Sequence, residues 1–414
     1  MNPLGAALLA AVLIIVPMGA SASGNATFSG PRLTTAVDRM TSAVSCSSGV
    51  GEAARPTPVL LVHGSGGTSR EAWAHSYQPS LTARGHAVCT VDLPAFGVGD
   101  VQVSTEYVVH AIRRVHALAG RPISVIGLSK GAFEIVLAMR MWRDLASKVD
   151  DVVGLAGVYD LGSQTIATRC DTRGACVPAF HQIRAGSPFL QAVRSWPLPA
   201  GPSYTLLGSR QDRTVTPQPA ANAMPGALSL MVEDVCPSRG VSVTHGMFVG
   251  DAVAHALALD ALDHPGRADR ARLDPAVCEK QYYDAFDEEG HRAAQVVRSY
   301  AETATAPAVR CYYLRNCSDA SSRGRLIRDV EVRVRASRIV VRAAAVRPGT
   351  IELRLAGKRV VRKVIPGQVR LRIARPVTRT ARMKTLRVRT DLPAYTAWAP
   401  EHRTRVPARS QRQR

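Results

Sequence analysis

The stretch from residue 123 to residue 142 constrains the fold of this chain more than any other. Residues 123–126 (ISVI) are a short apolar run typical of a buried strand, and residues 132–142 have the apolar pattern of a helix. Between them, residues 127–131 read GLSKG, a G-x-S-x-G motif. Where a strand enters a helix through this motif, the turn is so tight that glycines flank the serine. The stretch therefore predicts a strand-turn-helix unit that presents the Ser129 hydroxyl at the carboxyl end of a buried strand.

Further short apolar runs alternate with helical patterns along the first three quarters of the chain. Strands are predicted over 59–62, 87–91, 151–155 and 203–207. A helix is predicted over 105–119, with Thr105 as its cap. This alternation favours an α/β fold, a mostly parallel sheet with helices on both faces. Residues 161–199 interrupt the alternation, which is typical of a cap or lid and equally of a plain structural excursion.

A serine hydroxyl is a poor nucleophile at neutral pH and needs a base, which an acid must orient. Where a G-x-S-x-G serine lies on such a sheet, the order along the chain is serine, acid, histidine. Asp212 is the favoured acid because it lies on the loop just after the apolar strand 203–207. Asp160 also follows a strand but comes early in the chain, and Asp234 is a weaker candidate.

His245 is the favoured base among the later histidines. It follows the short extended run 241–244 and precedes Gly246. His255 lies in an alanine-rich helical stretch and is interpreted as a histidine on a helix surface. His264 precedes a proline and indicates a turn. The sequence therefore predicts a Ser129, Asp212, His245 triad.

The oxyanion of a tetrahedral intermediate needs hydrogen-bond donors. One predicted donor is the backbone N–H of Lys130, the residue after the serine. The other is expected from the glycine-rich loop 63–67 (HGSGG), where Ser65 offers both its N–H and its hydroxyl. His63 precedes the serine in the chain and is interpreted as a residue that positions this loop.

The first 22 residues have the pattern of a signal peptide. An apolar run covers residues 4–16, and residues 20–22 (ASA) fit a cleavage site of the A-x-A type. No Lys or Arg precedes the run, so an N-terminal membrane anchor is the alternative. The run is shorter than the ~20 apolar residues that a membrane span needs. We therefore expect a secreted, extracellular protein.

Eight cysteines in an exported chain predict four disulfides. Two spacings are local, Cys170 with Cys176 and Cys311 with Cys317. Four cysteines must pair over longer loops: Cys46, Cys89, Cys236 and Cys278. A zinc site is disfavoured because the sequence has no C-x-x-C pair. No cofactor and no metal are expected.

The net charge of +21 is concentrated in the last quarter of the chain, where residues 318–414 hold 26 Lys and Arg against 6 Asp and Glu. Apolar residues and arginines alternate there, as in half-buried antiparallel strands, over 330–335, 351–355, 369–373 and 386–389. Residues 356–359 supply a hairpin turn. The predicted domains are a catalytic domain over 23–317, a small all-β domain over 318–398 and a basic disordered tail over 399–414.

The basic segment indicates attachment to an anionic surface, such as a cell-wall polymer or anionic lipid. The alternative is a solubilising domain that has no partner. Nucleic acid is not an expected partner, because no recognised reader motif accompanies the charge.

These residues give the chain a resemblance to a known family. It resembles the α/β-hydrolases of the Candida antarctica lipase B type and their secreted actinobacterial relatives. The stretches that carry the resemblance lie between residues 46 and 317, and they are 58–64 (PVLLVHG), 105–109 (TEYVV), 147–150 (SKVD) and 235–246 (VCPSRGVSVTHG). The resemblance implies an α/β-hydrolase fold and a secreted serine lipase or carboxylesterase that acts on acylglycerol or fatty-acyl esters.

Position by position, the resemblance implies Ser129 as nucleophile, Asp212 as acid and His245 as base. It implies oxyanion donors at Ser65 and Lys130. It further implies two disulfides, Cys46–Cys89 and Cys236–Cys278.

Three residues depart from the family pattern. Lys130 stands where the family usually has glutamine; its backbone N–H is kept, but a cation is added beside the oxyanion hole. Ala132 replaces the second glycine after the serine, and Leu128 replaces an aromatic residue and so widens the expected pocket. The alternatives to a hydrolase are an acyltransferase of the same fold and a non-catalytic surface-binding protein, and the intact Ser-Asp-His order disfavours the latter.

Overall fold

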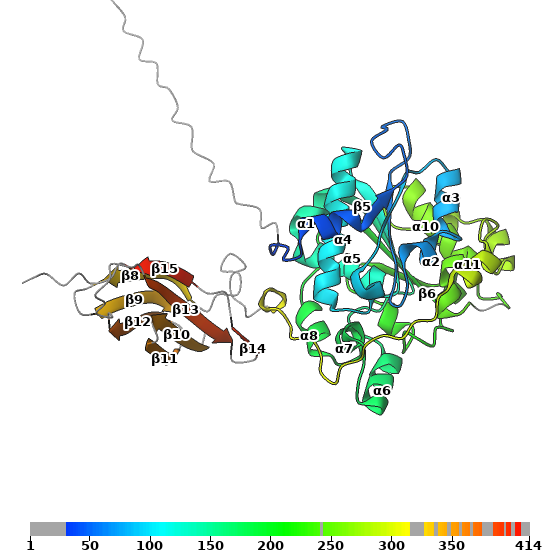
Figure 1. The fold of residues 1–414 in the computed structure, drawn as a ribbon. Helices are drawn as coiled ribbons and strands as arrows, with labels where there is room; N and C mark the ends of the chain where they lie inside the picture. Colours follow the sequence, from blue (N-terminus) through cyan, green and yellow to red (C-terminus); the bar gives the residue numbers. More distant parts are fainter. Residues whose placement is uncertain are drawn as a thin grey trace, which may run out of the picture.

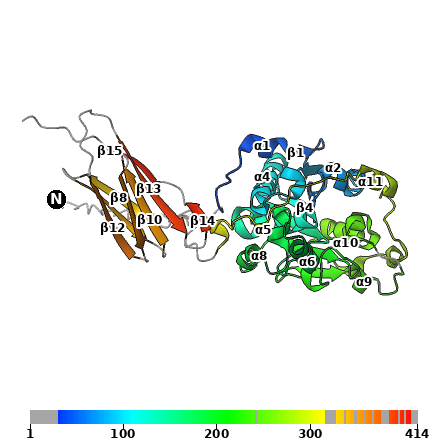
Figure 2. The same cartoon turned by 60° about the horizontal axis from the view of Figure 1, so that its bottom comes forward.

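The computed structural model describes residues 30–240 and 243–314, followed by eight strands between residues 327 and 406 (Figures 1 and 2). The predicted signal peptide and Cys317 lie outside the described residues. Within the part of the chain that is described, no helix has the length and apolar character needed to cross a membrane.

A seven-stranded sheet forms the centre of the first 314 residues. Its strands are β1 (Val44–Cys46), β2 (Val59–Val62), β3 (Val88–Val91), β4 (Ile123–Leu128), β5 (Val149–Leu155), β6 (Ser203–Gly208) and β7 (Leu228–Met231). Their spatial order is β1-β3-β2-β4-β5-β6-β7. Only β1 is antiparallel to its neighbour; β2 to β7 are parallel. The predicted mostly parallel sheet is therefore present.

Helices cover the sheet. The α-helices are α1 (Val37–Ser42), α2 (Ser69–Trp73), α3 (Tyr77–Ala83), α4 (Val101–Ala119), α5 (Lys130–Met141), α6 (Gln164–Arg173), α7 (Pro178–Ile183), α8 (Pro188–Val193), α9 (Val232–Val235), α10 (Ala252–Asp263) and α11 (Glu288–Ala294). Short 3-10 turns are η1 (Pro94–Gly97), η2 (Arg143–Ser147), η3 (Ala220–Asn222), η4 (His245–Gly250), η5 (Arg270–Arg272), η6 (Pro275–Glu279) and η7 (Cys311–Tyr313).

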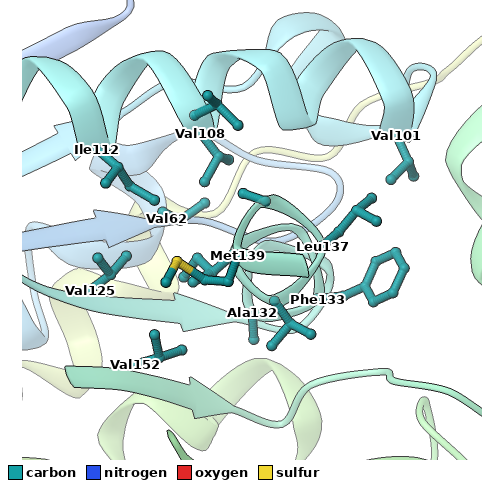
Figure 3. Packing of buried hydrophobic residues seen from close by; sticks show 14 of the residues in the cluster. Val62, Val101, Val108, Ile112, Val125, Ala132, Phe133, Leu137, Met139 and Val152 are labelled. Atoms are coloured by element: carbon teal, nitrogen blue, oxygen red, sulfur yellow. The ribbon is translucent and has the colours of Figure 1, made fainter. Parts of the chain in front are cut away.

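The two faces of the sheet bury separate apolar clusters, because successive side chains of a strand point to opposite faces. Along β2, Leu60 and Val62 belong to one cluster, with side chains of α4 and α5. Val59 and Leu61 belong to the other, with side chains of α2, α3 and α10. Figure 3 shows the first cluster, in which Ile112 of α4 lies close to the sheet. A strand buried on both faces explains why β2 is apolar throughout.

Helix α4 begins four residues earlier than the sequence predicted. The Asp100 side chain accepts a hydrogen bond from the Gln102 N–H at 2.9 Å and caps the helix. Thr105, the predicted cap, instead lies inside the helix, where its hydroxyl donates to the Val101 carbonyl at 2.7 Å. A threonine hydroxyl in a helix interior is commonly satisfied this way.

Three disulfides are present in the described residues. Cys46–Cys89 and Cys236–Cys278, which the family resemblance implies, are both formed, as is the local pair Cys170–Cys176. The first joins directly opposed residues of β1 and β3. The second holds the segment after α9 to the turn after α10.

The interrupting residues 161–199 form α6, α7 and α8. Backbone hydrogen bonds at 2.8 and 3.0 Å join Cys176, after α6, to Thr303. The segment that approaches Thr303 from α11, residues 295–303, is here called the strap.

The arginine-rich part of the chain contains strands where the alternating pattern predicted them. The four predicted runs lie in β8 (Ile327–Val334), β10 (Gly349–Leu355), β12 (Gly367–Ala374) and β13 (Lys384–Leu392). Four further strands were not predicted: β9 (Arg338–Ala345), β11 (Lys358–Val364), β14 (Tyr395–Trp398) and β15 (His402–Val406). Strands β11-β10-β13-β14 form one sheet, to which β15 is added on β13, and β12-β9-β8 form another. All of their pairings are antiparallel.

The expectation of a disordered tail over 399–414 is corrected for residues 402–406. This stretch is strand β15, which pairs with β13 over five residues. Its sequence, HRTRV, places arginine at every second position, so it has the same period of two as the strand it joins. Polar composition alone predicted disorder and missed this period.

Candidate active site

Ser129 lies in a sharp turn between β4 and α5. Its backbone is in the left-handed region, with φ 52° and ψ −120°, and its N–H donates to the Leu155 carbonyl of the neighbouring strand at 2.8 Å. A Cβ on Gly127 would lie 2.6 Å from backbone atoms of α5, and one on Gly131 would lie 2.3 Å from a carbonyl oxygen of the loop after β2. The neighbouring backbone therefore leaves no room for a side chain at either glycine of the motif. A strained backbone of this kind is often found at functional sites.

His245 and Asp212 form a hydrogen-bonded chain with Ser129. The Nε2 atom of His245 lies 3.0 Å from Ser129 Oγ, and its Nδ1 lies 2.7 Å from Asp212 Oδ2. The second carboxylate oxygen of Asp212 accepts the N–H groups of Thr214 and Val215 at 2.8 and 2.9 Å. Because an ionised carboxylate only accepts hydrogen bonds, Nδ1 carries the imidazole proton and Nε2 is free to accept the serine proton.

The three side chains come from loops at one edge of the sheet. Ser129 follows β4 and Asp212 lies on the loop after β6, while His245 begins η4. The carboxyl ends of parallel strands meet at the same edge, which is where ligands bind in open α/β sheets. The structure thus brings together the three residues that the sequence selected.

The alternative acids are engaged elsewhere. Asp160 receives two hydrogen bonds from the Arg140 guanidinium, at 2.6 and 2.9 Å. Asp234 pairs with Arg210 on the surface, at 2.8 Å. Asp160 and Asp234 are thus each paired with an arginine.

His255 is buried, in contrast to the surface position that the sequence suggested. Its Nε2 lies 2.7 Å from the Ser80 hydroxyl, and its ring stacks on Tyr283 with 3.6 Å between centroids. Burial lowers the pKa of His255 to about 3. The sequence prediction was wrong because α10 is buried over most of its length, and its small alanine side chains are part of the core. His264 ends α10, as the predicted turn requires.

The loop after β2 approaches the serine closely. A Cβ on Gly64 would lie only 3.1 Å from the Cβ of Ser129. The Ser65 hydroxyl is buried and has no hydrogen-bond partner among the described residues. Ser65, Ser129 and His245 line one cavity of about 140 Å³. A buried hydroxyl without a partner is costly unless something binds it, so Ser65 is available to a group that enters this cavity.

His63 holds this loop in place. Its Nδ1 lies 2.7 Å from the Gly64 carbonyl, and its Nε2 accepts the Leu93 N–H at 2.9 Å. Burial lowers the pKa of His63 to about 4, so the ring is neutral at physiological pH. These contacts fit the loop-positioning role inferred from the sequence.

The strap adds a contact that the sequence did not suggest. Tyr300 donates its hydroxyl proton to the Gly66 carbonyl at 2.6 Å. The carboxylate of Glu71 accepts the Val296 N–H and the Arg298 guanidinium, at 3.0 and 2.7 Å. More than 220 residues separate the members of each pair. In the sequence, the only mark of Glu71 is the T-x-x-E capping box, in which Thr68 and Glu71 begin α2. This motif does not indicate a contact with the strap.

Lys130 does not add a free cation to the oxyanion hole, so that expectation is corrected. Its Nζ lies 2.6 Å from Glu134 Oε1 and 3.4 Å from the Ser104 hydroxyl, and the Lys130 and Glu134 side chains are fully buried. Burial lowers the pKa of Lys130 and raises that of Glu134, and each partner opposes the shift of the other. The pair carries no net charge wherever the shared proton sits. The Lys130 side chain is therefore engaged by Glu134 and Ser104 and is not available to the oxyanion hole.

Removing one partner of this pair should strongly destabilise the protein. We expect Lys130→Met or Glu134→Leu alone to lower the free energy of unfolding by about 3–5 kcal/mol, because an uncompensated buried charge remains. The double variant should recover much of this loss. Urea unfolding of the four proteins measures the effect.

The surface pair Lys280 and Asp284 is a matched control, with the same i, i+4 spacing and both side chains exposed. Lys280→Met should change stability little. If the two buried single variants cost no more than this control, or if the double variant costs the sum of the two, the pair does not act as described.

Comparison with known proteins places these features in context. No family model matches the chain. Lipase B of Pseudozyma antarctica is 30% identical over 139 residues, which are 33% of this chain and 40% of that protein. The crystal structure of Aspergillus fumigatus lipase B superposes with a TM-score of 0.61 at 23% identity, covering 69% of this chain and 73% of that one. The chain therefore has an α/β-hydrolase fold, and its resemblance to lipase B is confirmed in sequence over a part of that relative's length.

Within the described residues, no group of three or more His, Cys, Asp and Glu side chains is arranged to hold a metal ion.

Proposed function

We propose that this chain is a secreted serine hydrolase that cleaves carboxylic esters, a lipase or carboxylesterase for acylglycerol or fatty-acyl esters. The observation that carries the proposal is the hydrogen-bonded chain from Asp212 through His245 to Ser129, beside the unpartnered Ser65 hydroxyl. The name lipase B of the relatives supports the ester class. The disulfides support an exported protein, since such bonds persist in oxidising compartments.

The proposed reaction has two halves. Ser129 Oγ attacks the ester carbonyl carbon while its proton passes to Nε2 of His245, and Asp212 stabilises the imidazolium. The carbonyl oxygen becomes an oxyanion that accepts hydrogen bonds from Ser65 and from the Lys130 N–H. The intermediate then collapses, and the alcohol leaves with the proton from His245. Water repeats the sequence on the acyl-enzyme and releases the acid and Ser129.

A panel of p-nitrophenyl esters of rising acyl length tests this proposal on the full chain. We expect hydrolysis whose rate depends on acyl length and requires Ser129. Adding a simple alcohol separates hydrolysis from acyl transfer, because a transferase would form the alkyl ester in preference to the free acid. Absence of turnover across the panel by a folded protein would refute the proposal.

Replacing Ser65 by alanine should lower kcat by about 10²–10³, the typical cost of losing one oxyanion donor. The side chain loses only an oxygen that has no partner in the resting protein, so stability should hardly change. Kinetics on a soluble ester and a thermal melt measure the two effects. An unchanged kcat would remove the Ser65 hydroxyl from the oxyanion hole and leave only its N–H as donor.

We also propose that the arginine-rich strands form a separate all-β domain that attaches the enzyme to an anionic surface, either cell-wall polymer or anionic lipid. Support comes from the charge of +20 in residues 318–414 and from the exposure of Arg370 and Arg372 on β12. Attraction by exposed charge is long-ranged and weakened by salt.

Ending the chain at residue 318 should leave kcat on a soluble short-chain ester unchanged. The same truncation should abolish salt-sensitive binding to vesicles that contain anionic lipid. Sedimentation with vesicles and a kinetic assay measure both properties, with circular dichroism to establish that the shortened chain is folded. Loss of soluble-ester hydrolysis by a folded truncated chain would contradict this division of labour.

A further inference from the structure

A second, larger cavity adjoins the catalytic one. It has a volume of about 560 Å³, against about 140 Å³ for the cavity that contains Ser129. Ser65 and Gly66, the loop residues next to the serine, line both cavities. An ester whose carbonyl lies at Ser129 can therefore extend past Ser65 into this larger space.

The walls of the larger cavity carry three arginines and one acid. Arg173 pairs with that acid, Glu302, at 3.2 Å. Arg298 is paired with Glu71 at 2.7 Å. Arg169 is different: its guanidinium lies 5.8 Å from the centre of the Phe180 ring, and it forms no hydrogen bond or ion pair with the described residues. Among the residues that the structure describes, Arg169 is thus the cavity arginine that has no carboxylate partner.

The two cavity arginines of α6 are neighbours on the helix surface. Arg169 and Arg173 are four residues apart, so they lie on the same face of the helix, where like charges repel. The Cys170–Cys176 disulfide and the backbone pairing of Cys176 with Thr303 fix the end of this helix against the strap. Because Glu302 already balances Arg173, an anion that enters the cavity would be attracted chiefly to Arg169, with Arg173 one helical turn away.

The remaining walls indicate what carries the anion. Val98, Val177 and Phe180 supply apolar surface, and Ser299 and Tyr300 supply hydroxyl groups. A ligand that fits has an apolar arm that ends in a negative charge. Guanidinium groups bind carboxylates and phosphates with charge-assisted hydrogen bonds.

We propose that this cavity selects esters that carry an anionic group, a carboxylate or a phosphate, on the part of the substrate that extends past Ser65. Arg169 is the specificity-determining residue. The proposal rests on the proposed ester hydrolysis at Ser129 and narrows its substrate class.

Pairs of substrates, one with the anionic group and one with that group capped or absent, test the proposal on the full chain. The carboxylate arm compares mono-p-nitrophenyl esters of linear dicarboxylic acids with their methyl-capped counterparts. The phosphate arm compares short-chain phosphatidic acid with the matching diacylglycerol. We expect the wild type to have the higher kcat/KM for the anionic member of at least one pair. The arm that shows this preference identifies the anion.

Arg169→Gln should lower that preference about 3- to 10-fold, while kcat/KM for the neutral member stays within about twofold. Arg194→Gln is the matched control: it removes an exposed arginine of the same three-helix segment that does not line the cavity. Arg194→Gln should leave the preference for the anionic substrate unchanged. It thereby controls for the general attraction of anions to a positively charged chain. Raising the salt concentration should weaken the preference of the wild type.

A binding measurement separates this proposal from the proposed function. Calorimetry on the full-length Ser129→Ala protein compares hexylphosphonate and hexanoate with hexanol. At least one of the two anions should bind more tightly than hexanol, and Arg169→Gln should remove most of this difference. If no ester is hydrolysed but this binding pattern holds, the anion site stands and the hydrolase proposal fails. If esters are hydrolysed but the wild type prefers the neutral member of both pairs, or Arg169→Gln behaves like Arg194→Gln, the anion site is overturned.

Discussion

Ser129→Ala should abolish ester hydrolysis, with a loss in kcat on the order of 10⁶. The Ser129 hydroxyl is the group that His245 Nε2 contacts at 3.0 Å, and no other hydroxyl forms a hydrogen bond to this histidine among the described residues. The fold should survive, because alanine keeps the Cβ of serine in the turn at φ 52° and loses only the hydroxyl oxygen. The variant is therefore expected to be a folded protein that lacks the nucleophile.

Kinetics on the ester panel, with circular dichroism and a thermal melt, measure this prediction. An active-site titration with a fluorophosphonate should label the wild type once per chain and leave the variant unlabelled. Hydrolysis at the wild-type rate by a folded Ser129→Ala protein would contradict the proposed mechanism.

His245→Ala and Asp212→Asn should act as members of one unit. We expect His245→Ala to cost about as much as Ser129→Ala, and Asp212→Asn to cost about 10⁴ in kcat, because an amide in place of the carboxylate can stabilise the wrong tautomer of the histidine. The double variant should be little worse than His245→Ala alone. Single-turnover and steady-state kinetics of the four proteins measure the cycle.

Asp234→Asn is the matched control, since Asp234 was the weakest of the three candidate acids and pairs with Arg210 on the surface. It should leave kcat unchanged. Additive losses in the double variant, or a comparable loss in Asp234→Asn, would mean that the acid has been assigned to the wrong residue.

The parts of the site that sequence could predict are those set by local backbone rules. The turn at Ser129 follows from a strand, two glycines and a helix that are adjacent in the chain. The choice of Asp212 and His245 follows from their order after the serine and from the loops after the strands, which lie at one edge of the sheet. None of these inferences required knowledge of which side chains meet across the fold.

The features that sequence missed depend on contacts between distant segments. Tyr300 supports the loop at Gly66 from 234 residues away, and no local pattern marks such a partner. His255 was assigned to the surface because the helix pattern of α10 does not show what packs against it. Lys130 was expected to add a charge, since sequence gives the position of a side chain but not its direction.

The buried pair of Lys130 and Glu134 bears on how this chain diverged from its relatives. A glutamine after the serine would carry no charge and would not require the glutamate one helical turn later. Either charged residue alone would be buried without a counterion, which would destabilise the fold. The two positions are therefore expected to co-vary among related sequences, so that a lysine after the serine is accompanied by an acid four residues later. Exchanging the pair for two uncharged residues by single substitutions would therefore pass through a protein that is less stable than either end state.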